Sequence, residues 1–232
     1  MFSLTPDLIS LILKETIPSF QLSCRATQNL GFGFLYYGLV RTVRPKFTVV
    51  IGSKAGFTPV LAALAVKDNE GTGIASIDCE STELVDPGKP GLVHFIDPSL
   101  SIFRNDPGNW YGHGLWDQSE DVLRRWQQFS VEHYIRHFKL KSCEYLEQFP
   151  PQIPIDLLIV DGDHSYGGIM FDLTKFYPYL SDSALALAHD VDPRCKESRG
   201  FQVLNDLPAH MYELMRIPIF PGLGLLRKKA AA

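Results

Sequence analysis

Residues 47–59 read Phe47-Thr48-Val49-Val50-Ile51-Gly52-Ser53-Lys54-Ala55-Gly56-Phe57-Thr58-Pro59. The first five are β-branched or aromatic and uncharged, which is typical of a strand buried on both faces of a parallel sheet. The two glycines allow a sharp turn and the close approach of a ligand. An alanine- and leucine-rich helix is predicted to begin at about Pro59, with its N-terminal N–H groups facing the turn. This arrangement predicts a nucleotide-type binding site.

The glycine pattern alone leaves an ordinary strand-to-helix turn equally open. It reads Gly-x-x-x-Gly, so it lacks the Gly-x-Gly-x-x-Gly of dinucleotide folds and the Lys-Ser/Thr ending of a phosphate-binding loop. Glycine is also common in turns that bind nothing. The rest of the chain must therefore decide between the two interpretations.

Length and composition predict one large α/β domain. The 232 residues can bury a substantial core, and no linker divides them. We expect a single domain over 1–232, with a helical segment at 1–45 and an insertion at about 80–117. The net charge of -4 gives no footprint for nucleic acid. The four cysteines lack Cys-x-x-Cys spacing, which favours free thiols.

Membrane and export signals are absent from the sequence pattern. No apolar run approaches the ~20 residues that a membrane helix requires. The first ten residues lack the basic start and long apolar core of a signal peptide. We therefore expect a cytoplasmic protein with no membrane and no nucleic acid among its partners.

Two further apolar runs end in ionisable residues. Residues 155–160 read as a buried parallel strand that stops at Asp161-Gly162-Asp163-His164-Ser165-Tyr166, and residues 184–188 read as a strand that stops at His189-Asp190. Ligands of open α/β sheets bind outside the carboxyl ends of the strands, so these residues predict a functional site. The alternative for the residues after the first strand is a capped turn at the start of the helix predicted over 168–180.

Asp78 is a candidate for binding a ribose. Residues 72–77 read as a second strand, and Asp78 follows it a little over twenty residues after Gly52. In nucleotide-binding sheets an acid at this place accepts hydrogen bonds from the ribose hydroxyls. A turn or cap residue is the alternative. We interpret the Pro-, Gly- and aromatic-rich stretch at 80–117 as an insertion over the substrate side, with a surface excursion as its alternative.

The end of the chain discriminates between fold families. Two strand-like runs, 211–217 and 224–227, follow each other without an intervening helix and should pair as a hairpin. We therefore predict a Rossmann-like, doubly wound α/β fold whose mostly parallel seven-stranded sheet ends in an antiparallel hairpin strand. A dehydrogenase would end with another crossover helix. The other expected helices are 6–20, 27–43 (a lid over the site or a helix packed on the sheet), 117–129, 142–149 and 201–207, and a short strand is expected at 133–140.

This combination resembles class I S-adenosylmethionine-dependent methyltransferases. The resemblance covers about residues 27–227 and rests on Asp161 to Tyr166, His189-Asp190, the turn from Ile51 to Gly56, and Pro221 to Gly224. Within the family, the branch with these strand-end motifs is similar to small-molecule and sugar O-methyltransferases and to cephalosporin-hydroxylase-like proteins. The resemblance implies S-adenosylmethionine as cofactor. The residues that it implies for cofactor binding are Gly52, Ser53, Gly56, Asp78, Ser142 and Asp161.

One residue departs from the family pattern. The family usually carries an acid two positions before the first glycine, where this sequence has Val50. This position therefore offers no carboxylate to contact the ammonium group of the cofactor.

The resemblance leaves two chemistries open. Relatives that methylate hydroxyl groups hold a divalent cation at positions that correspond to Asp161, His189 and Asp190, where Mg²⁺ or another divalent cation would lower the pKa of an acceptor hydroxyl. Histidine is softer than magnesium prefers, so a metal-free site with His164 or His189 as general base is the alternative. Asp161, His164 and His189 are the catalytic candidates in either case.

The predicted function is transfer of a methyl group to an oxygen of a small hydroxylated or glycosylated acceptor. A non-catalytic binding protein with the same fold is one alternative, motivated by Val50. A Rossmann-type NAD(P) oxidoreductase is the other, which the missing glycine fingerprint disfavours. A small molecule is the expected partner, and the sequence leaves a monomer and a homo-oligomer both open.

Overall fold

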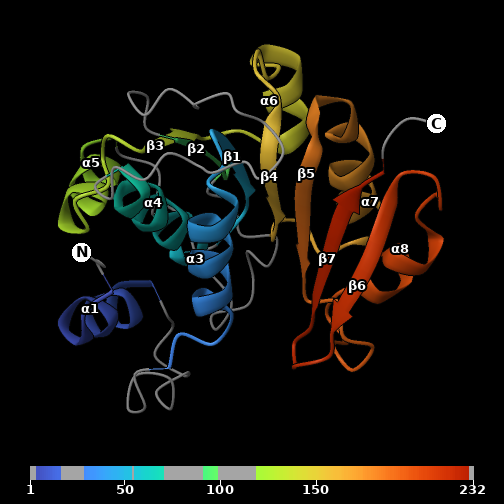
Figure 1. Cartoon of the computed structure of the whole chain (residues 1–232), viewed down its shortest axis with the longest axis horizontal. Helices are drawn as coiled ribbons and strands as arrows, with labels where there is room; N and C mark the ends of the chain where they lie inside the picture. The colour runs from blue at the N-terminus through green and yellow to red at the C-terminus, as the bar shows by residue number, and fades with distance from the viewer. Residues whose placement is uncertain (1–3, 17–28, 54, 71–90, 99–118, 230–232) are drawn as a thin grey trace, which may run out of the picture.

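The computed structural model describes residues 4–16, 29–53, 55–70, 91–98 and 119–229. Its centre is a seven-stranded sheet in the order β3-β2-β1-β4-β5-β7-β6 (Figure 1). Strands β1 to β5 pair in parallel, and β7 runs antiparallel to both of its neighbours. This confirms the predicted fold. The strands are β1 (Phe47–Ile51), β2 (Leu92–Ile96), β3 (Ile135–Phe138), β4 (Ile155–Val160), β5 (Leu180–His189), β6 (Tyr212–Ile217) and β7 (Leu223–Lys228).

Helices cover both faces of the sheet, because the strands carry apolar residues at successive positions. In β1, Val50 belongs to the cluster beneath one helical layer, whereas Val49 and Ile51 belong to the cluster beneath the other, as the two-residue period of a strand requires. The first layer contains α1 (Pro6–Thr16), α3 (Phe32–Val43), α4 (Phe57–Glu70) and α5 (Ser119–Gln128), and the second contains α6 (Ser142–Gln148), α7 (Tyr166–Lys175) and α8 (Gly200–Asp206).

The predicted boundaries shift where side chains cap the helices. Helix α4 begins at Phe57 rather than at about Pro59, and the Ser53 hydroxyl accepts a hydrogen bond from the Thr58 N–H at 2.9 Å. Helix α7 begins at Tyr166 rather than at residue 168, because Ser165 caps it. It also ends at Lys175, and a 3₁₀ turn, η2 (Tyr177–Tyr179), leads into a strand β5 that is longer than predicted.

The second strand of the sheet is a correction to the sequence prediction. The strand beside β1 is Leu92–Ile96, which pairs with β1 in parallel from Leu92 to Ile96 and with β3 on its other side. The prediction had placed this segment in the insertion at 80–117 and had given the strand position to residues 72–77. Residues 72–77 lie outside the described residues, as do 80–90 and 99–117 of the predicted insertion.

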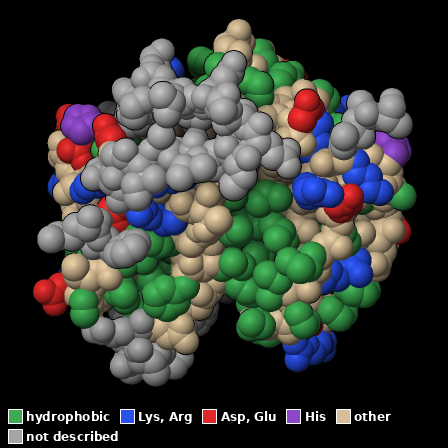
Figure 2. All heavy atoms as spheres, in the orientation of Figure 1, with side chains coloured by type: hydrophobic (Ala, Val, Ile, Leu, Met, Phe, Trp, Pro, Cys, Tyr) green, Lys and Arg blue, Asp and Glu red, His purple; other side chains and the backbone are tan. Residues whose placement is uncertain are grey.

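The C-terminal hairpin completes the sheet and carries an exposed apolar surface. Figure 2 shows hydrophobic side chains gathered over this part of the molecule. Those with the largest exposure are Leu214, Met215, Ile219 and Phe220. Cys143 and Cys195 are free, as predicted, while Cys24 and Cys79 lie outside the described residues. Among the helices that the structure describes, none combines the length and apolarity needed to cross a membrane.

Candidate active site

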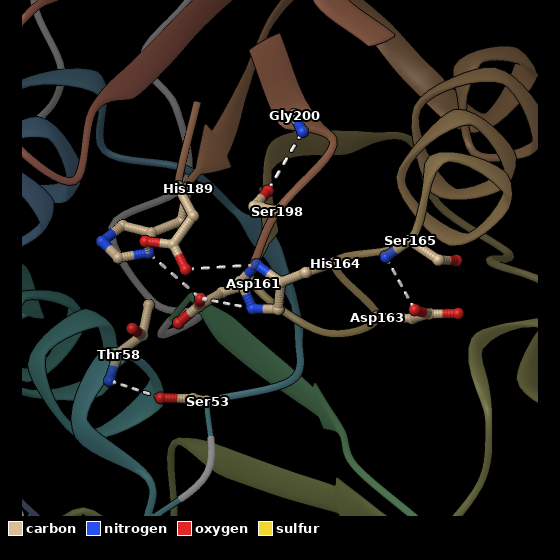
Figure 3. A network of polar contacts seen from close by, with 10 residues as sticks. Ser53, Thr58, Asp161, Asp163, His164, Ser165, His189, Ser198 and Gly200 are labelled. Carbon is tan, nitrogen blue, oxygen red and sulfur yellow. Dashed lines mark hydrogen bonds and ion pairs between the residues drawn. The ribbon is translucent and has the colours of Figure 1, made fainter. Parts of the chain in front are cut away.

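Four ionisable side chains meet where β4 and β5 end. The two strands pair in parallel, with Val160 opposite Ala188, so the residues that follow them emerge side by side. Asp161 and His164 come from the turn after β4, and His189 comes from the end of β5 (Figure 3). Asp190 directly follows His189 in the chain. The structure therefore brings together the predicted catalytic residues and the third predicted metal ligand.

The four side chains form alternating carboxylate–imidazole contacts. His189 Nδ1 lies 2.9 Å from Asp190 Oδ1 and 3.3 Å from Asp161 Oδ1. His164 Nδ1 lies 3.2 Å from Asp190 Oδ2, and its Nε2 lies 3.9 Å from Asp161 Oδ1. Each of these side chains is between 19% and 21% exposed, so solvent reaches the cluster without screening it fully.

His189 is held in its charged form. Burial opposes the imidazolium, but Asp161 and Asp190 outweigh burial and raise the pKa of His189 to about 10. The contact is mainly electrostatic, since the Nδ1 hydrogen points well at neither carboxylate. The raised pKa favours the imidazolium form of His189 at neutral pH, which makes His164 the better candidate for a general base.

Some residues of the motif after β4 cap helix α7, and others belong to the charged cluster. Asp163 Oδ1 accepts a hydrogen bond from the Ser165 N–H at 2.9 Å, and Ser165 Oγ accepts one from the Gly168 N–H at 3.1 Å. The capped-turn interpretation therefore holds for Asp163. Asp161 and His164 instead face the cluster, and the His164 carbonyl accepts a hydrogen bond from the Arg199 N–H at 2.9 Å.

The backbone at Asp190 is strained and tightly anchored. Asp190 has φ 57, a left-handed value that residues other than glycine adopt at a cost. The next two residues receive support from the hairpin loop, where the Val191 and Asp192 N–H groups donate to the carbonyls of Gly222 and Pro221. The surrounding structure thus fixes the direction of the Asp190 carboxylate.

The glycine turn packs directly against the turn after β4. Gly52 has φ 69, and a Cβ at this position would collide with the backbone of Asp161 and Gly162. Gly56 also has a positive φ, of 86. The turn requires glycine for conformation at both places. It also brings the α4 N-terminus to the same edge of the sheet as the carboxylate–imidazole cluster, which fits a ligand that contacts both.

Two predicted cofactor residues have structural partners of their own. Ser53 caps α4, and Ser142, the first residue of α6, hydrogen-bonds the carboxyl group of Asp172 on α7. Burial raises the pKa of Asp172 to about 7, the Ser142 hydrogen bond lowers it, and nearby Asp163 raises it. The structure thus fixes the position of Ser142 without testing a contact to adenine.

Asp97 holds the position that the sequence analysis had given to Asp78. It follows β2, is 8% exposed, and its N–H donates to the Phe138 carbonyl at 3.0 Å. His137 Nε2, from the same strand β3, lies 3.1 Å from the Asp97 carbonyl oxygen. Asp78 lies outside the described residues. The signal for Asp97 in the sequence is Ile96-Asp97, the same dipeptide as Ile77-Asp78.

The three predicted metal ligands, Asp161, His189 and Asp190, lie together at this edge of the sheet. Among the described residues, however, no group of three His, Cys, Asp or Glu side chains has a geometry that could hold a metal ion. The Asp161 and Asp190 carboxylates instead contact His189 Nδ1, at 3.3 Å and 2.9 Å, and the divalent-cation site stays a prediction.

Helix α3 contributes two residues to the site that the sequence analysis did not single out for function. The Phe32 ring meets the His189 ring edge-on, with centroids 5.7 Å apart, and the Tyr36 ring lies 6.5 Å from it. The interpretation of this segment as a packed helix is confirmed, since α3 packs on α4, and its role as a lid stays a prediction. The signal was the four-residue spacing of the two aromatics, which places them on one face of a helix.

A family model matches the central part of the chain. Residues 49–191 match the model of the methyltransferase domain family, which is more than half of the chain. The protein therefore belongs to that family, and its fold is the Rossmann-like methyltransferase fold. No curated protein shows a significant match to the chain.

Several solved structures share the fold across nearly the whole chain. A methyltransferase from Geobacter sulfurreducens is 16% identical, covers 99% of this chain and 100% of its own, and has a TM-score of 0.57. The O-methyltransferase TomG from Streptomyces achromogenes, in complex with SAM, is 13% identical, with coverages of 97% and 89% and a TM-score of 0.58. An O-methyltransferase from Bacillus cereus, in complex with SAH, is 13% identical, with coverages of 99% and 100% and a TM-score of 0.56. At these identities the likeness shows a shared fold.

Proposed function

We propose that the protein is a methyltransferase that uses S-adenosylmethionine to methylate an oxygen of a small hydroxylated acceptor. The observation that carries this proposal is the cluster of Asp161, His164, His189 and Asp190, which lies against the glycine turn of a methyltransferase fold. Ligand-bound neighbours with SAM and SAH support the choice of cofactor. Glycosylated acceptors belong to the same proposal, because a sugar presents the same hydroxyl oxygens.

The cofactor would lie across the carboxyl ends of β1, β2 and β3. Gly52 and Gly56 bring the backbone and the α4 N-terminus toward its methionine end, with Ser53 holding that helix start. Asp97, at the end of β2, is the acid that we propose for the ribose hydroxyls. Ser142, at the start of α6, would lie beside the adenine.

The chemistry follows from the charges of the cluster. S-adenosylmethionine supplies an electrophilic methyl group on a positively charged sulfur. The carboxylates of Asp161 and Asp190 outnumber the His189 imidazolium, so the site attracts a cation and repels an anion. His164 is the proposed general base: its ring nitrogen would take the proton of the acceptor hydroxyl as the oxygen bonds to the methyl carbon and the carbon–sulfur bond breaks, which would leave S-adenosylhomocysteine. Asp190 holds the His164 ring from Nδ1.

Binding measurements separate the proposed function from its alternatives. Isothermal titration with S-adenosylmethionine, S-adenosylhomocysteine and NAD should show binding of the two sulfur ligands alone. Binding of NAD without either sulfur ligand would overturn the proposal in favour of an oxidoreductase. Methyl transfer from labelled S-adenosylmethionine to a panel of phenols, sugars and glycosides then tests turnover, and binding without any transfer would favour a non-catalytic protein.

A pair of variants tests the ribose contact. Asp97→Asn should weaken S-adenosylhomocysteine binding by about tenfold or more, because a buried charge-assisted hydrogen bond is lost. Asp78→Asn is the matched variant. If Asp78→Asn weakens binding and Asp97→Asn does not, the ribose contact belongs to Asp78, as the sequence analysis had it.

A further inference from the structure

Tyr36 carries a buried hydroxyl group that lacks a partner. Its side chain is 2% exposed, and the hydroxyl oxygen makes no hydrogen bond within the described part of the chain. Buried hydroxyls are normally hydrogen-bonded, because burial removes their water. The neighbouring Tyr37 hydroxyl donates to Asp68, and the Tyr212 hydroxyl donates to the Leu173 carbonyl at 2.8 Å. Tyr36 therefore differs from these two tyrosines in having a hydroxyl group without a partner among the described residues.

The Tyr36 ring lies beside the active-site cluster. Tyr36 lies one helical turn after Phe32 on the same face of α3, and both rings contact the ring of His189. A tyrosine phenol is neutral at physiological pH, and Asp161 and Asp190 are the carboxylates that act on it.

The field at this place selects a cation. The Asp161 and Asp190 carboxylates meet the imidazole rings of His164 and His189 here, and β1, which reads Phe-Thr-Val-Val-Ile, contributes no charged side chain. A ligand carboxylate would be repelled here, whereas a ligand ammonium group would be attracted. An ammonium group also carries several N–H donors, and a neutral phenol oxygen can accept one of them.

We propose that the Tyr36 oxygen accepts a hydrogen bond from the α-ammonium group of the bound cofactor, with Asp161 supplying the opposite charge. The inference rests on the proposed function and adds to it a ligand-binding residue from α3, outside the glycine turn and the strand-end motifs. It gives the buried hydroxyl a partner and makes the amino-acid end of the cofactor a determinant of affinity.

Two ligands and two variants test the inference. S-adenosylhomocysteine has the ammonium group, whereas 5′-methylthioadenosine keeps the adenosine and the sulfur but lacks the amino-acid end. By isothermal titration, Tyr36→Phe should weaken S-adenosylhomocysteine binding about fivefold to twentyfold and leave 5′-methylthioadenosine binding unchanged. Tyr37→Phe, which removes the hydroxyl bonded to Asp68, should leave the ratio of the two affinities unchanged.

The outcomes distinguish this inference from the proposed function. Unchanged S-adenosylhomocysteine affinity in Tyr36→Phe, or equal weakening of both ligands, would overturn the inference and leave the cofactor assignment intact. Failure of the unmodified protein to bind S-adenosylhomocysteine would overturn both. The unmodified protein gives a second measurement that needs no variant: an S-adenosylhomocysteine analogue without the amino group should bind at least about tenfold more weakly, and equal affinity would reject the ammonium contact.

Discussion

The turn after β1 and the turn after β4 both join a buried strand to a helix at the same edge of the sheet. The first works through its backbone, since Gly52 has no room for a side chain and Ser53 is used to cap α4. The second works through side chains, which divide between capping α7 and the charged cluster. The comparison shows that two turns of the same strand–turn–helix type offer a ligand different features. The turn after β1 offers a close-packed backbone, and the turn after β4 offers charged side chains.

The largest expected effect is at the first turn. Gly52→Ala introduces a Cβ that collides with the backbone of Asp161 and Gly162 at a positive φ, so it should lower the free energy of unfolding by roughly 2–4 kcal/mol and abolish cofactor binding. Urea unfolding and isothermal titration measure the two effects. Gly38→Ala is the control, because nothing lies within 4 Å of its added Cβ and stability should stay equal or rise. If Gly52→Ala bound the cofactor as tightly as the unmodified protein, close backbone packing at this turn would not be required for binding.

The two acids of the second turn should differ in their effect on activity. Asp161→Asn removes a carboxylate from the cluster and should lower kcat by about 100-fold or more, and it should also lower Tm, because the His189 imidazolium loses an ionic partner. Asp163→Ala removes only the hydrogen bond to the Ser165 N–H and should lower stability by about 1 kcal/mol with activity retained. Turnover and thermal unfolding of both variants check this. Equal turnover in the two variants would contradict the assignment of Asp161 to the site and of Asp163 to the helix cap.

The charge of His189 should appear as a pH-dependent stability. Its pKa is about 10 in the folded protein and about 6.5 in an unfolded chain. Because the folded value is raised, the stabilisation is complete below about pH 6.5 and is lost as the pH rises toward 10. The difference in Tm between the unmodified protein and His189→Gln should therefore be largest near pH 6 and shrink toward pH 10. A difference that grows with pH would contradict the charged assignment.

The smallest expected effect is that of metal removal. Because the imidazolium of His189 lies between the carboxylates, methyl transfer should be unchanged after treatment with a chelator and should not rise when magnesium or manganese is added. Turnover assays with and without chelator measure this. Loss of activity that is restored by magnesium would instead favour Asp161, His189 and Asp190 as metal ligands.

Most of the fold was predictable because its strands are strongly patterned. The runs at β1 and β4 are apolar throughout, and the closing hairpin lacks a helix between its strands. The second strand was not predictable in this way. Ile77-Asp78 and Ile96-Asp97 present the same local signal, and the choice between them depends on pairing with β1, a contact that no local pattern encodes.

The site was predictable in its members but not in its protonation. Strand pairing alone brings Asp161 and His164 to His189 and Asp190, so the motifs sufficed to locate the cluster. The charge of His189 depends on distances to two carboxylates, which sequence does not give. The role proposed for the Tyr36 hydroxyl could not be predicted either, because the sequence pattern of a helical aromatic residue is the same whether or not its hydroxyl has a hydrogen-bond partner.

The anchoring of the β5 loop by the last hairpin has a consequence for synthesis on the ribosome. The carbonyls that receive the Val191 and Asp192 N–H groups belong to Gly222 and Pro221, which are translated about thirty residues later. Until that hairpin has emerged, the segment that follows Asp190 lacks this support. The residues of the β1 turn are thus translated early, whereas the backbone after Asp190 gains its hydrogen bonds to the hairpin loop only near the end of translation.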